Sequence, residues 1–356
     1  MKRVPLESIR PEVRAIEGYH LKAYDCPVKL NQNESPFDIP DEMKDEILGL
    51  VRNQPWSRYP RPMESDLVDA LADYTGWKPD GLIVCNGSNT LIQLIIAITT
   101  TPGVAVAVPS PSFSLYALYA GMFGGRVVSV PLTDHFTYDL AGLRHSLEVE
   151  KPRTVFLCSP NNPTGCGIGN EDLRSLLAAS DSLFVVDEAY GEFSDSTALD
   201  LLPEFGNLVV LKTFSKALGA AGIRIGYLLG HPTLVAEILK GKIPFDINVF
   251  SHAAAMHILQ HRDMIPRHVD ALRAERHRVE SALGGMAGVK AYPSAANFIL
   301  FEVSDTKAVF DALVDRGILV RDVTGYPMLK KALRVTVGRP EEDDRFLGAL
   351  ADIVTR

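Results

Sequence analysis

The sequence predicts an α/β protein whose large domain has a mostly parallel, seven-stranded sheet flanked by helices, with a smaller α+β domain beside it. Short, almost continuously apolar segments alternate with amphipathic segments between about residues 80 and 230. Strands that are buried on both faces of a parallel sheet have this pattern. A chain of 356 residues is long enough for one large domain and a smaller one.

The expected elements of the large domain follow one another in a regular order. The expected strands are 82–85, 104–108, 126–130, 154–158, 183–186, 208–212 and 227–230. The helices expected between them are 88–99, 112–123 and 171–179. Because apolar strands alternate with helical segments, we expect a layered α/β architecture.

The pattern changes after about residue 232. A long polar helix is expected over 262–285, ending at a glycine pair. Strands are then expected at 298–303, 318–320 and 333–337, with helices at 306–316 and from about 340. We therefore expect an N-terminal arm (1–35), a large domain (36–240, with part of 36–80 joining the small domain), and connecting helices with a small domain (241–356).

Composition narrows the class of protein. Hydrophobic residues make up 46% of the chain and charged residues 22%, as in ordinary globular enzymes. The net charge of −8 argues against a general nucleic-acid or membrane-surface binder, because both need a basic face. The N-terminus has no apolar signal segment, and Gln93, Pro102 and Gly103 interrupt the longest apolar stretch, so we expect a cytoplasmic protein.

The cysteines and histidines suggest neither a redox motif nor a metal site. The four cysteines, Cys26, Cys85, Cys158 and Cys166, include no C-x-x-C pair, so buried free thiols are expected. The nine histidines include no H-E-x-x-H motif. We find no plausible zinc set and expect no metal.

Polar residues follow the expected strands, where open α/β sheets bind their ligands. After strand 82–85, Gly87, Ser88 and Asn89 precede a helix whose free N–H groups suit a phosphate. A glycine turn with a serine N-cap is the structural alternative. After strand 104–108, Phe113 could stack on a planar ring or belong to the core.

The next two strands are followed by an amide, a carboxylate and a phenol. The rigid turn 159–165, which includes Asn162, presents an amide side chain. Asp187 ends an apolar strand and Tyr190 follows it. A carboxylate there is costly without a cationic partner. A protonated heterocyclic nitrogen would serve, and so would a helix N-cap or a salt bridge within the protein.

Hydroxyl, amine and guanidinium groups follow strand 208–212. Thr213, Ser215 and Arg224 can clamp a phosphate. Lys216 could form a Schiff base if its surroundings lower its pKa, although a solvated lysine is the commoner arrangement. Pyridoxal 5′-phosphate explains all these positions together, because it has a phosphate, a ring, a pyridine nitrogen, a phenolic oxygen and an aldehyde. Neither a Walker A motif nor a Rossmann fingerprint in its required context occurs.

Eight motifs carry a resemblance that covers nearly the whole chain. They are "LNQNESP" (30–36), "RYPRP" (58–62), "SPNNPTG" (159–165), "VVDEAYGEF" (185–193), "TFSKALGAAGIRIGY" (213–227), "SAANFILF" (294–301), "GILVRD" (317–322) and "LRVTVGRPEE" (333–342). With these motifs the chain resembles the fold-type I pyridoxal-phosphate aminotransferases and, within them, the histidinol-phosphate aminotransferase family. Ser35, Arg61 and Phe113 depart from the usual pattern of that family, and Arg61 puts an extra cation near the expected subunit interface.

The resemblance implies a role for each cofactor-site residue. Lys216 would carry an internal aldimine and move the substrate proton in a ping-pong transamination, and Asp187 would keep the pyridine nitrogen protonated. Asn162 and Tyr190 would bind the phenolic oxygen. The remaining contacts would be ring stacking by Phe113 and phosphate binding by Ser88, Asn89, Thr213, Ser215 and Arg224. Tyr59 would reach the cofactor phosphate of the neighbouring subunit, which implies a homodimer with shared sites.

The substrate side requires an anion site. Arg334 stands in the apolar strand "LRVTV" and should have an anionic partner, unless it is an edge-strand arginine that points to solvent. Arg321 is a second candidate. The resemblance implies that both arginines hold the substrate phosphate and the carboxylate of glutamate. Tyr19 and Asn33 on the arm are weaker candidates for the same pocket.

Several functions remain open from the sequence. The leading hypothesis is transamination between glutamate and imidazole-acetol phosphate, which gives histidinol phosphate and 2-oxoglutarate. An aromatic amino-acid aminotransferase and a threonine-phosphate decarboxylase are alternatives, because the same cofactor serves either bond cleavage. A cofactor-sensing regulator would need a DNA-binding head, and no basic helix-turn-helix segment precedes residue 30.

Overall fold

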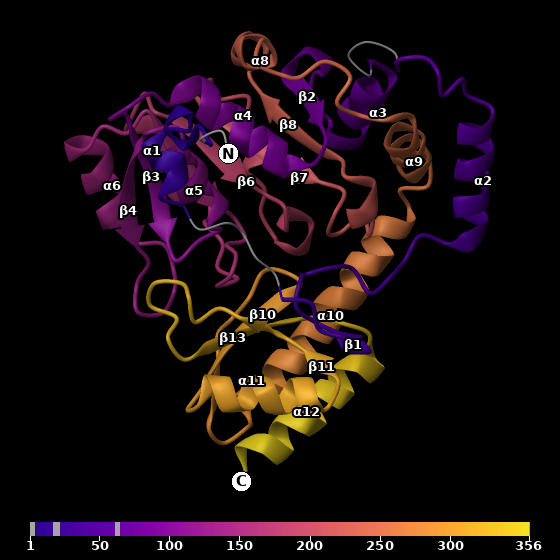
Figure 1. Ribbon diagram of the computed structural model, residues 1–356, viewed down its shortest axis with the longest axis vertical. Helices are drawn as coiled ribbons and strands as arrows, with labels where there is room; N and C mark the ends of the chain where they lie inside the picture. Colours follow the sequence, from indigo (N-terminus) through magenta and orange to yellow (C-terminus); the bar gives the residue numbers. More distant parts are fainter. Residues whose placement is uncertain (1–3, 17–21, 61–64, 356) are drawn as a thin grey trace.

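A seven-stranded sheet forms the centre of the computed structural model, which describes residues 4–16, 22–60 and 65–355 (Figure 1). The strand order is β2-β8-β7-β6-β5-β3-β4. The strands are β2 (Leu82–Cys85), β3 (Ala105–Ser110), β4 (Arg126–Pro131), β5 (Thr154–Cys158), β6 (Leu183–Asp187), β7 (Leu208–Thr213) and β8 (Gly226–Gly230). β8 runs antiparallel to both of its neighbours, and the other strand pairs are parallel. The predicted seven-stranded, mostly parallel sheet is confirmed.

Alternate residues of the strands pack into two apolar clusters, one on each face of the sheet. Ile83 and Val185 belong to one cluster, whereas the adjacent Val84 and Val186 belong to the other. This alternation follows from the two-residue side-chain period of a strand. The first cluster includes residues of α4 (Ser88–Thr99), α5 (Leu115–Met122) and α8 (Pro232–Leu239), and the second includes residues of α6 (Leu140–Val149) and α7 (Asn170–Ala178).

A second, four-stranded antiparallel sheet lies in the C-terminal part. Its order is β12 (Arg321–Asp322), β13 (Ala332–Thr336), β10 (Phe298–Val303) and β9 (Val289–Ala291). The long helix α10 (Met264–Gly284) runs from the large sheet to this sheet (Figure 1). Helices α11 (Thr306–Asp315) and α12 (Pro340–Val354) pack against each other beside the small sheet. The expected strand 318–320 is divided in two, because β11 (Ile318–Leu319) pairs with the N-terminal segment and β12 pairs with β13.

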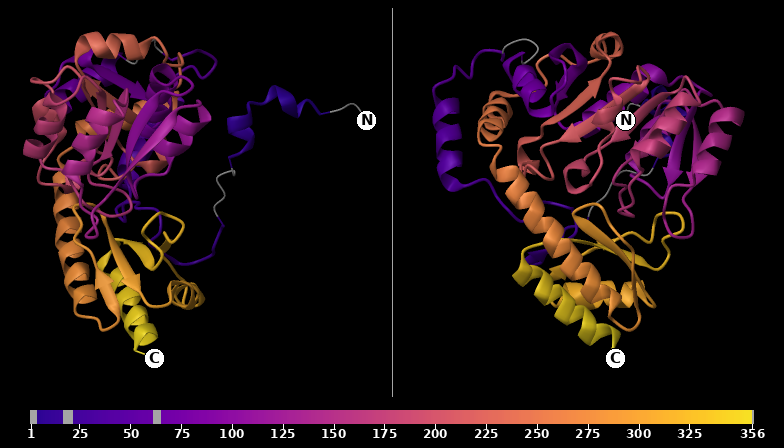
Figure 2. Two further views of the ribbon diagram at one scale, coloured as in Figure 1. Left: turned by 90° about the vertical axis from the view of Figure 1, so that its left-hand side faces the viewer. Right: turned by 180° about the vertical axis from the view of Figure 1, so that it is seen from behind.

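The N-terminal region, residues 4–75 as described, contacts elements of both sheets. A 3₁₀ turn (Leu6–Ser8) and α1 (Pro11–Arg14) form a segment that projects from the body (Figure 2). β1 (Val28–Lys29) pairs in parallel with β11. Helices α2 (Asp41–Arg52) and α3 (Ser65–Thr75) pack against α9 (Val249–Gln260), and α3 also contacts β2. Residues 28–33 therefore lie against the C-terminal part of the chain, because Asn31 and Asn33 also contact β13. The expected domain boundaries stay a prediction.

Short 3₁₀ turns complete the structure at Pro79–Gly81, Gly191–Phe193, Ala198–Leu201 and Ala221–Ile223. The cysteines are free; Cys85 and Cys158 are buried as predicted, whereas Cys26 and Cys166 are half-buried. In the described part of the chain, every helix is too short or too polar to cross a membrane.

Candidate active site

A cavity of about 500 Å³ lies where the carboxyl ends of the large sheet meet the N-terminal segment and the small sheet. Every predicted site residue that the structure describes lines this cavity, with the exception of Tyr59. The predicted residues in its wall are Asn33, Ser88, Asn89, Phe113, Asn162, Asp187, Tyr190, Thr213, Ser215, Lys216, Arg224, Arg321 and Arg334. Tyr19 and Arg61 lie outside the described residues.

One end of the cavity is built to receive an anion. Helix α4 begins at Ser88, where the first N–H groups of a helix lack partners within it. A Cβ atom on Gly226 would lie 2.1 Å from the Ser88 nitrogen, so no side chain fits there. The Arg224 guanidinium donates from Nη1 to Ser215 Oγ at 3.1 Å, and Thr213 Oγ1 donates to the same hydroxyl at 3.0 Å. Amides, hydroxyls and a guanidinium converge there.

Asp187 is a buried carboxylate at the end of β6. Tyr116 donates from its hydroxyl to Asp187 Oδ2 at 2.7 Å, and the backbone N–H of Ala189 donates to Oδ1 at 3.0 Å. Burial raises the pKa of Asp187, and these two hydrogen bonds oppose the rise. The structural alternatives of a helix N-cap and a salt bridge are absent from the described contacts of Asp187. Such a carboxylate suits a cationic ligand group.

Tyr190 and Asn33 form a polar group on the wall nearest the small sheet. Asn33 Nδ2 donates to the Tyr190 hydroxyl at 2.9 Å. Asn33 adopts φ 55°, and its backbone N–H donates to Thr336 Oγ1 on β13 at 2.9 Å. Burial raises the pKa of Tyr190 well above its usual value, although Arg334 opposes the rise. The phenol is therefore neutral and can donate a hydrogen bond.

Lys216 lines the cavity between the large sheet and the N-terminal segment. Its Nζ donates to the backbone oxygen of Gln32 at 2.9 Å and lies 5.7 Å from the centre of the Tyr190 ring. Burial lowers the pKa of Lys216 to about 7, with the positive charge of Arg334 as the next contribution. A neutral amine is the nucleophilic form, so the surroundings favour covalent chemistry at this nitrogen.

Arg334 is buried in the interior of the small sheet. Its strand β13 lies between β12 and β10, so the alternative of an edge-strand arginine is wrong. The Arg334 guanidinium donates from Nη2 to the backbone oxygen of Asn31 at 2.8 Å and from Nη1 to Asn162 Oδ1. Arg321 is its register partner on β12. Two arginines of the small sheet thus line the cavity.

Phe113 and Tyr59 have different positions. Phe113 is half-buried in the cavity wall and meets the Tyr116 ring edge-on, with ring centres 5.6 Å apart. Tyr59 is 82% exposed, and its ring stacks on Phe245 at 4.9 Å, away from the cavity of its own chain. The role of Tyr59 in a neighbouring subunit stays a prediction.

Three residues of the site were missed from the sequence. Tyr116 holds Asp187, Gln32 accepts from Lys216, and Tyr326 lies in the cavity wall beside the two arginines. Tyr116 lies three residues after Phe113, so one helical turn could have suggested it. Gln32 acts through its backbone, which leaves no trace in the residue type.

The residues in the cavity fit the parts of pyridoxal 5′-phosphate. The anion end fits a phosphate, the buried Asp187 carboxylate fits a protonated ring nitrogen, and Lys216 fits an aldehyde. The close approach of Gly226 to Ser88 leaves the helix start bare, as a phosphate cradle requires. Asn162 accepts from Arg334 through Oδ1, which leaves its amide NH₂ to donate.

Comparisons with known proteins agree with this geometry. Residues 27–350 match the family model "Aminotransferase class I and II". A histidinol-phosphate aminotransferase of Chlorobium phaeovibrioides is 41% identical, covering 99% of both chains. One from a Thermoanaerobacter species is 36% identical, covering 97% of this chain and 98% of the relative.

Solved structures agree in fold. A histidinol-phosphate aminotransferase from Sinorhizobium meliloti, in complex with pyridoxal-5′-phosphate, superposes with a TM-score of 0.88 at 26% identity, covering 100% of this chain and 98% of the other. An L-threonine-O-3-phosphate decarboxylase from Porphyromonas gingivalis shares the fold, with a TM-score of 0.80 at 22% identity and coverage of 92% and 100%. The chain belongs to the aminotransferase class I and II family.

Proposed function

We propose that the protein is a pyridoxal-phosphate-dependent aminotransferase that interconverts histidinol phosphate and 2-oxoglutarate with imidazole-acetol phosphate and glutamate. The observation that carries the proposal is one cavity whose wall includes Lys216, the anion-binding group around Arg224, and the two arginines of the small sheet, Arg321 and Arg334. Full-length identity of 41% to a histidinol-phosphate aminotransferase supports the choice of substrate.

The cofactor-binding residues have separate tasks. Ser88, Asn89, Thr213, Ser215 and Arg224 would hold the phosphate. Asp187 would hold a proton on the ring nitrogen, and Asn162 and Tyr190 would donate to the phenolic oxygen. Phe113 would lie against the ring. When bound, the cofactor supplies a carbonyl for the substrate amine and an electron sink for the bond that breaks at Cα.

Lys216 is the proposed proton carrier. Because burial lowers its pKa to about 7, the amine is readily available in its unprotonated form at neutral pH and could accept a proton from the substrate Cα. The backbone oxygen of Gln32 accepts a hydrogen bond from Nζ and so orients the amine. Lys216 would also be placed to return that proton to the bound cofactor, and hydrolysis by water would then release the 2-oxo product and complete the first half-reaction.

The two arginines are the proposed determinants of substrate class. Arg334 Nη2 is held by Asn31 on the N-terminal segment, and Arg321 lies beside Arg334 on the neighbouring strand. Paired guanidinium groups suit a phosphate in one half-reaction and a carboxylate in the other. A substrate with a phosphate at the end distant from its amine therefore fits the cavity better than an apolar one.

The assay that tests this function offers the holoenzyme glutamate with imidazole-acetol phosphate, then glutamate with phenylpyruvate, then threonine phosphate alone. We expect the highest kcat/KM with imidazole-acetol phosphate. Faster turnover of phenylpyruvate would make the protein an aromatic aminotransferase, and release of carbon dioxide from threonine phosphate would make it a decarboxylase. Arg334→Gln should raise KM for imidazole-acetol phosphate more than for an unphosphorylated 2-oxo acid.

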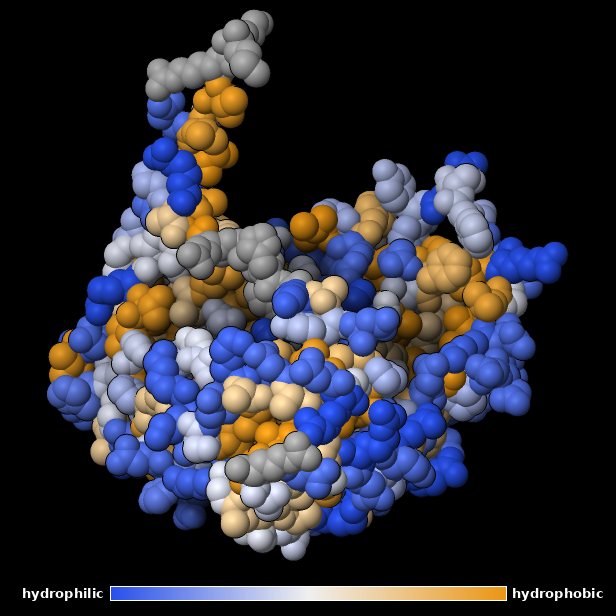
Figure 3. Space-filling model, turned by 60° about the horizontal axis from the view of Figure 1, so that its bottom comes forward, coloured by the Kyte–Doolittle hydropathy of each residue, from blue (hydrophilic) through white to orange (hydrophobic). Residues whose placement is uncertain are grey.

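We also propose a homodimer with shared sites. Trp56, Tyr59, Phe245 and Phe250 are exposed, with residue exposures of 66, 82, 41 and 42%. Their rings form two touching pairs, Trp56 with Phe250 and Tyr59 with Phe245. Figure 3 shows hydrophobic side chains along one side of the projecting N-terminal segment as well. Exposed aromatic clusters of this kind are typical of subunit contacts.

A mixing experiment tests the shared site. Lys216→Ala and Tyr59→Ala chains would each have impaired sites as homodimers. If Tyr59 serves the partner's site, a hybrid dimer has one complete site, so mixing the chains under exchange conditions should restore part of the activity. A monomer in sedimentation analysis, or no gain on mixing, contradicts the proposal.

A further inference from the structure

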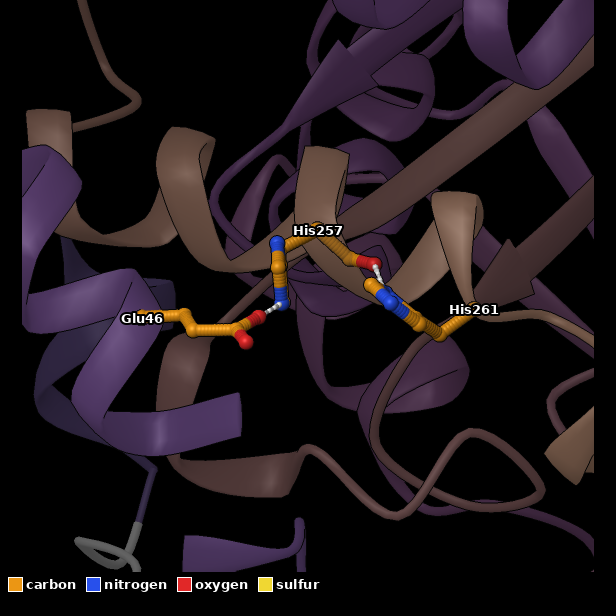
Figure 4. A group of neighbouring side chains, drawn as sticks. All are labelled: Glu46, His257 and His261. Carbon is orange, nitrogen blue, oxygen red and sulfur yellow. Dashed lines mark hydrogen bonds and ion pairs between the residues drawn. The ribbon is translucent and has the colours of Figure 1, made fainter. Parts of the chain in front are cut away.

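Glu46, His257 and His261 form a cluster of potential metal ligands on the side of the molecule where α2 packs against α9 (Figure 4). One ligand atom from each residue lies within 4.8 Å of the ligand atoms of the other two. None of the three lines the active-site cavity. The cluster is therefore separate from the candidate active site.

His257 is the buried member of the cluster. Its side chain is 8% exposed, and Nε2 lies 2.8 Å from Glu46 Oε2 on the neighbouring helix. Figure 4 shows the Glu46 carboxylate reaching from α2 toward this ring. An imidazole and a carboxylate facing one another across two helices are already two ligands of the type that zinc prefers.

The hydrogen bond of His261 leaves one of its ring nitrogens free to bind a metal. Its Nδ1 lies 3.0 Å from the backbone oxygen of His257, and a carbonyl oxygen accepts, so Nδ1 carries the hydrogen. In the neutral ring Nε2 then has a free lone pair. Metal-binding histidines usually donate their second ring nitrogen in this way, which fixes the ring and its basicity. The two rings lie with centres 4.5 Å apart.

The spacing needs only a small adjustment to hold an ion. Ligand atoms at zinc distances in a tetrahedral site are about 3.4 Å apart. The Glu46 and His261 side chains are exposed and can shift relative to the buried His257, with the Glu46 carboxylate moving slightly outward from its 2.8 Å approach to Nε2. Beside the cluster, Ile47 and Val51 of α2 pack on Ala253 and Ala254 of α9, so the helices are already in contact.

We propose that Glu46, His257 and His261 bind a divalent transition-metal ion, with zinc as the best match, and that this ion fastens α2 to α9. Two imidazoles and one carboxylate leave a fourth position for water, because the site opens to solvent at Glu46 and His261. The sequence did not reveal this set because Glu46 and His257 are far apart in the chain. This proposal replaces the expectation from the sequence that the protein binds no metal.

The experiment titrates chelator-treated, gel-filtered holoenzyme with zinc in a calorimeter and with cobalt in an absorption spectrometer. We expect saturation at one ion per chain, a cobalt spectrum typical of tetrahedral nitrogen and oxygen ligands, and an upward shift of the thermal midpoint with zinc. Competition from thiols should be weak, because burial raises the pKa of Cys26 and raises that of Cys166 to about 11.

Two exposed ligands allow clean variants. His261→Ala and Glu46→Gln should each weaken zinc binding by at least about tenfold and remove the thermal shift. His277→Ala is the matched control, since His277 is an exposed histidine that faces Glu280 at 3.5 Å on α10. It should bind zinc as the unaltered protein does.

Three results would overturn the site. They are the absence of saturable binding at one ion per chain, unchanged affinity in either ligand variant, and an equal loss of affinity in the His277→Ala control. Activity plays no part in this readout, so failure of the metal site and failure of the proposed function remain distinguishable.

Discussion

Lys212 and Lys216 lie four residues apart, at the end of β7 and just beyond it, yet their surroundings give the two amines opposite properties. Lys212 Nζ lies 3.2 Å from Glu188 Oε2 and 3.1 Å from Glu192 Oε1. Burial alone would lower the pKa of Lys212, but the two carboxylates outweigh it and raise the pKa. Lys212 is therefore a permanent cation that ties the end of β7 to the segment after β6.

Lys216 has cations for neighbours instead. Burial and then Arg334 lower its pKa to about 7, and the opposing carboxylate of Glu34 is itself paired with Lys29 at 2.6 Å. The two lysines show that the nearby charges, more than the residue type or burial, decide whether a buried amine is structural or reactive.

The largest expected effect is on Lys216. Lys216→Ala should reduce kcat/KM by more than about 10⁴-fold, because the proposed nucleophile and proton carrier is lost. Its melting temperature without cofactor should not fall, since a lysine with a lowered pKa binds fewer protons in the folded than in the unfolded chain near neutral pH. Steady-state kinetics and thermal melting check both statements. Near-normal turnover would remove Lys216 from the mechanism.

The reactivity of Lys216 should depend on pH with a midpoint of about 7. At neutral pH its reactive, unprotonated fraction would be about 10³-fold larger than that of an exposed lysine. Trapping pyridoxal 5′-phosphate on the cofactor-free chain with borohydride, followed by peptide mapping at several pH values, measures this midpoint. Arg334→Gln should move it upward, because a cation that disfavours the charged amine is removed. A midpoint near 10 in the unaltered chain would contradict the assignment.

Lys212→Ala should act on stability instead of chemistry. It leaves the Glu188 and Glu192 carboxylates buried without their cation, so we expect the free energy of unfolding to fall by about 3–5 kcal/mol. Urea denaturation of the cofactor-free protein measures the change. Lys240→Ala is the control, because Lys240 forms an exposed ion pair with Glu237 and should contribute little. An equal fall in the free energy of unfolding for both variants would show that the buried ion pairs of Lys212 stabilise the fold no more than an exposed ion pair does.

The smallest expected effect concerns Tyr116. Tyr116→Phe removes the hydroxyl that donates to Asp187 Oδ2, so the pKa of Asp187 should rise further and its pairing with a protonated ring nitrogen should weaken. We expect cofactor affinity to fall about tenfold, the value of one hydrogen bond to a charged group. Fluorescence titration measures it, with Tyr119→Phe on the same helix as the control.

The sequence predicted the large sheet well because its strands are continuous apolar runs. Six of the strands are parallel to one another, and β8 is the exception, since the residues that join it to β7 contain only a 3₁₀ turn instead of a crossover helix. Apolar content does not distinguish the two directions. Helices α1, α2, α3, α6, α8 and α9 were not predicted. For α2 the signal was present, because its buried residues Met43, Ile47 and Val51 recur every four positions.

The cofactor end of the site was predictable because each residue follows a strand in the same sheet. The contributions of other segments were harder to find. Arg334 was singled out by its charge in an apolar strand, but its contact with Asn31 depends on how residues from the two ends of the chain meet. Gln32 contributes a backbone oxygen, and the Glu46, His257 and His261 cluster joins two distant helices, so neither could be recognised from local sequence.

The reversed direction of β8 has a further consequence. Thr213 and Gly226 are register partners, and the backbone N–H of Phe214 donates to Ile225 O at 3.0 Å. Residues 214–225 therefore connect two paired antiparallel strands, and the hydrogen bonds between β7 and β8 fix both ends of this connection. Lys216, the proposed nucleophile, and Arg224, the proposed phosphate ligand, lie on one connection of fixed length whose ends are hydrogen-bonded to each other. Inserting a single residue there should spoil both functions together, while leaving the rest of the sheet in register.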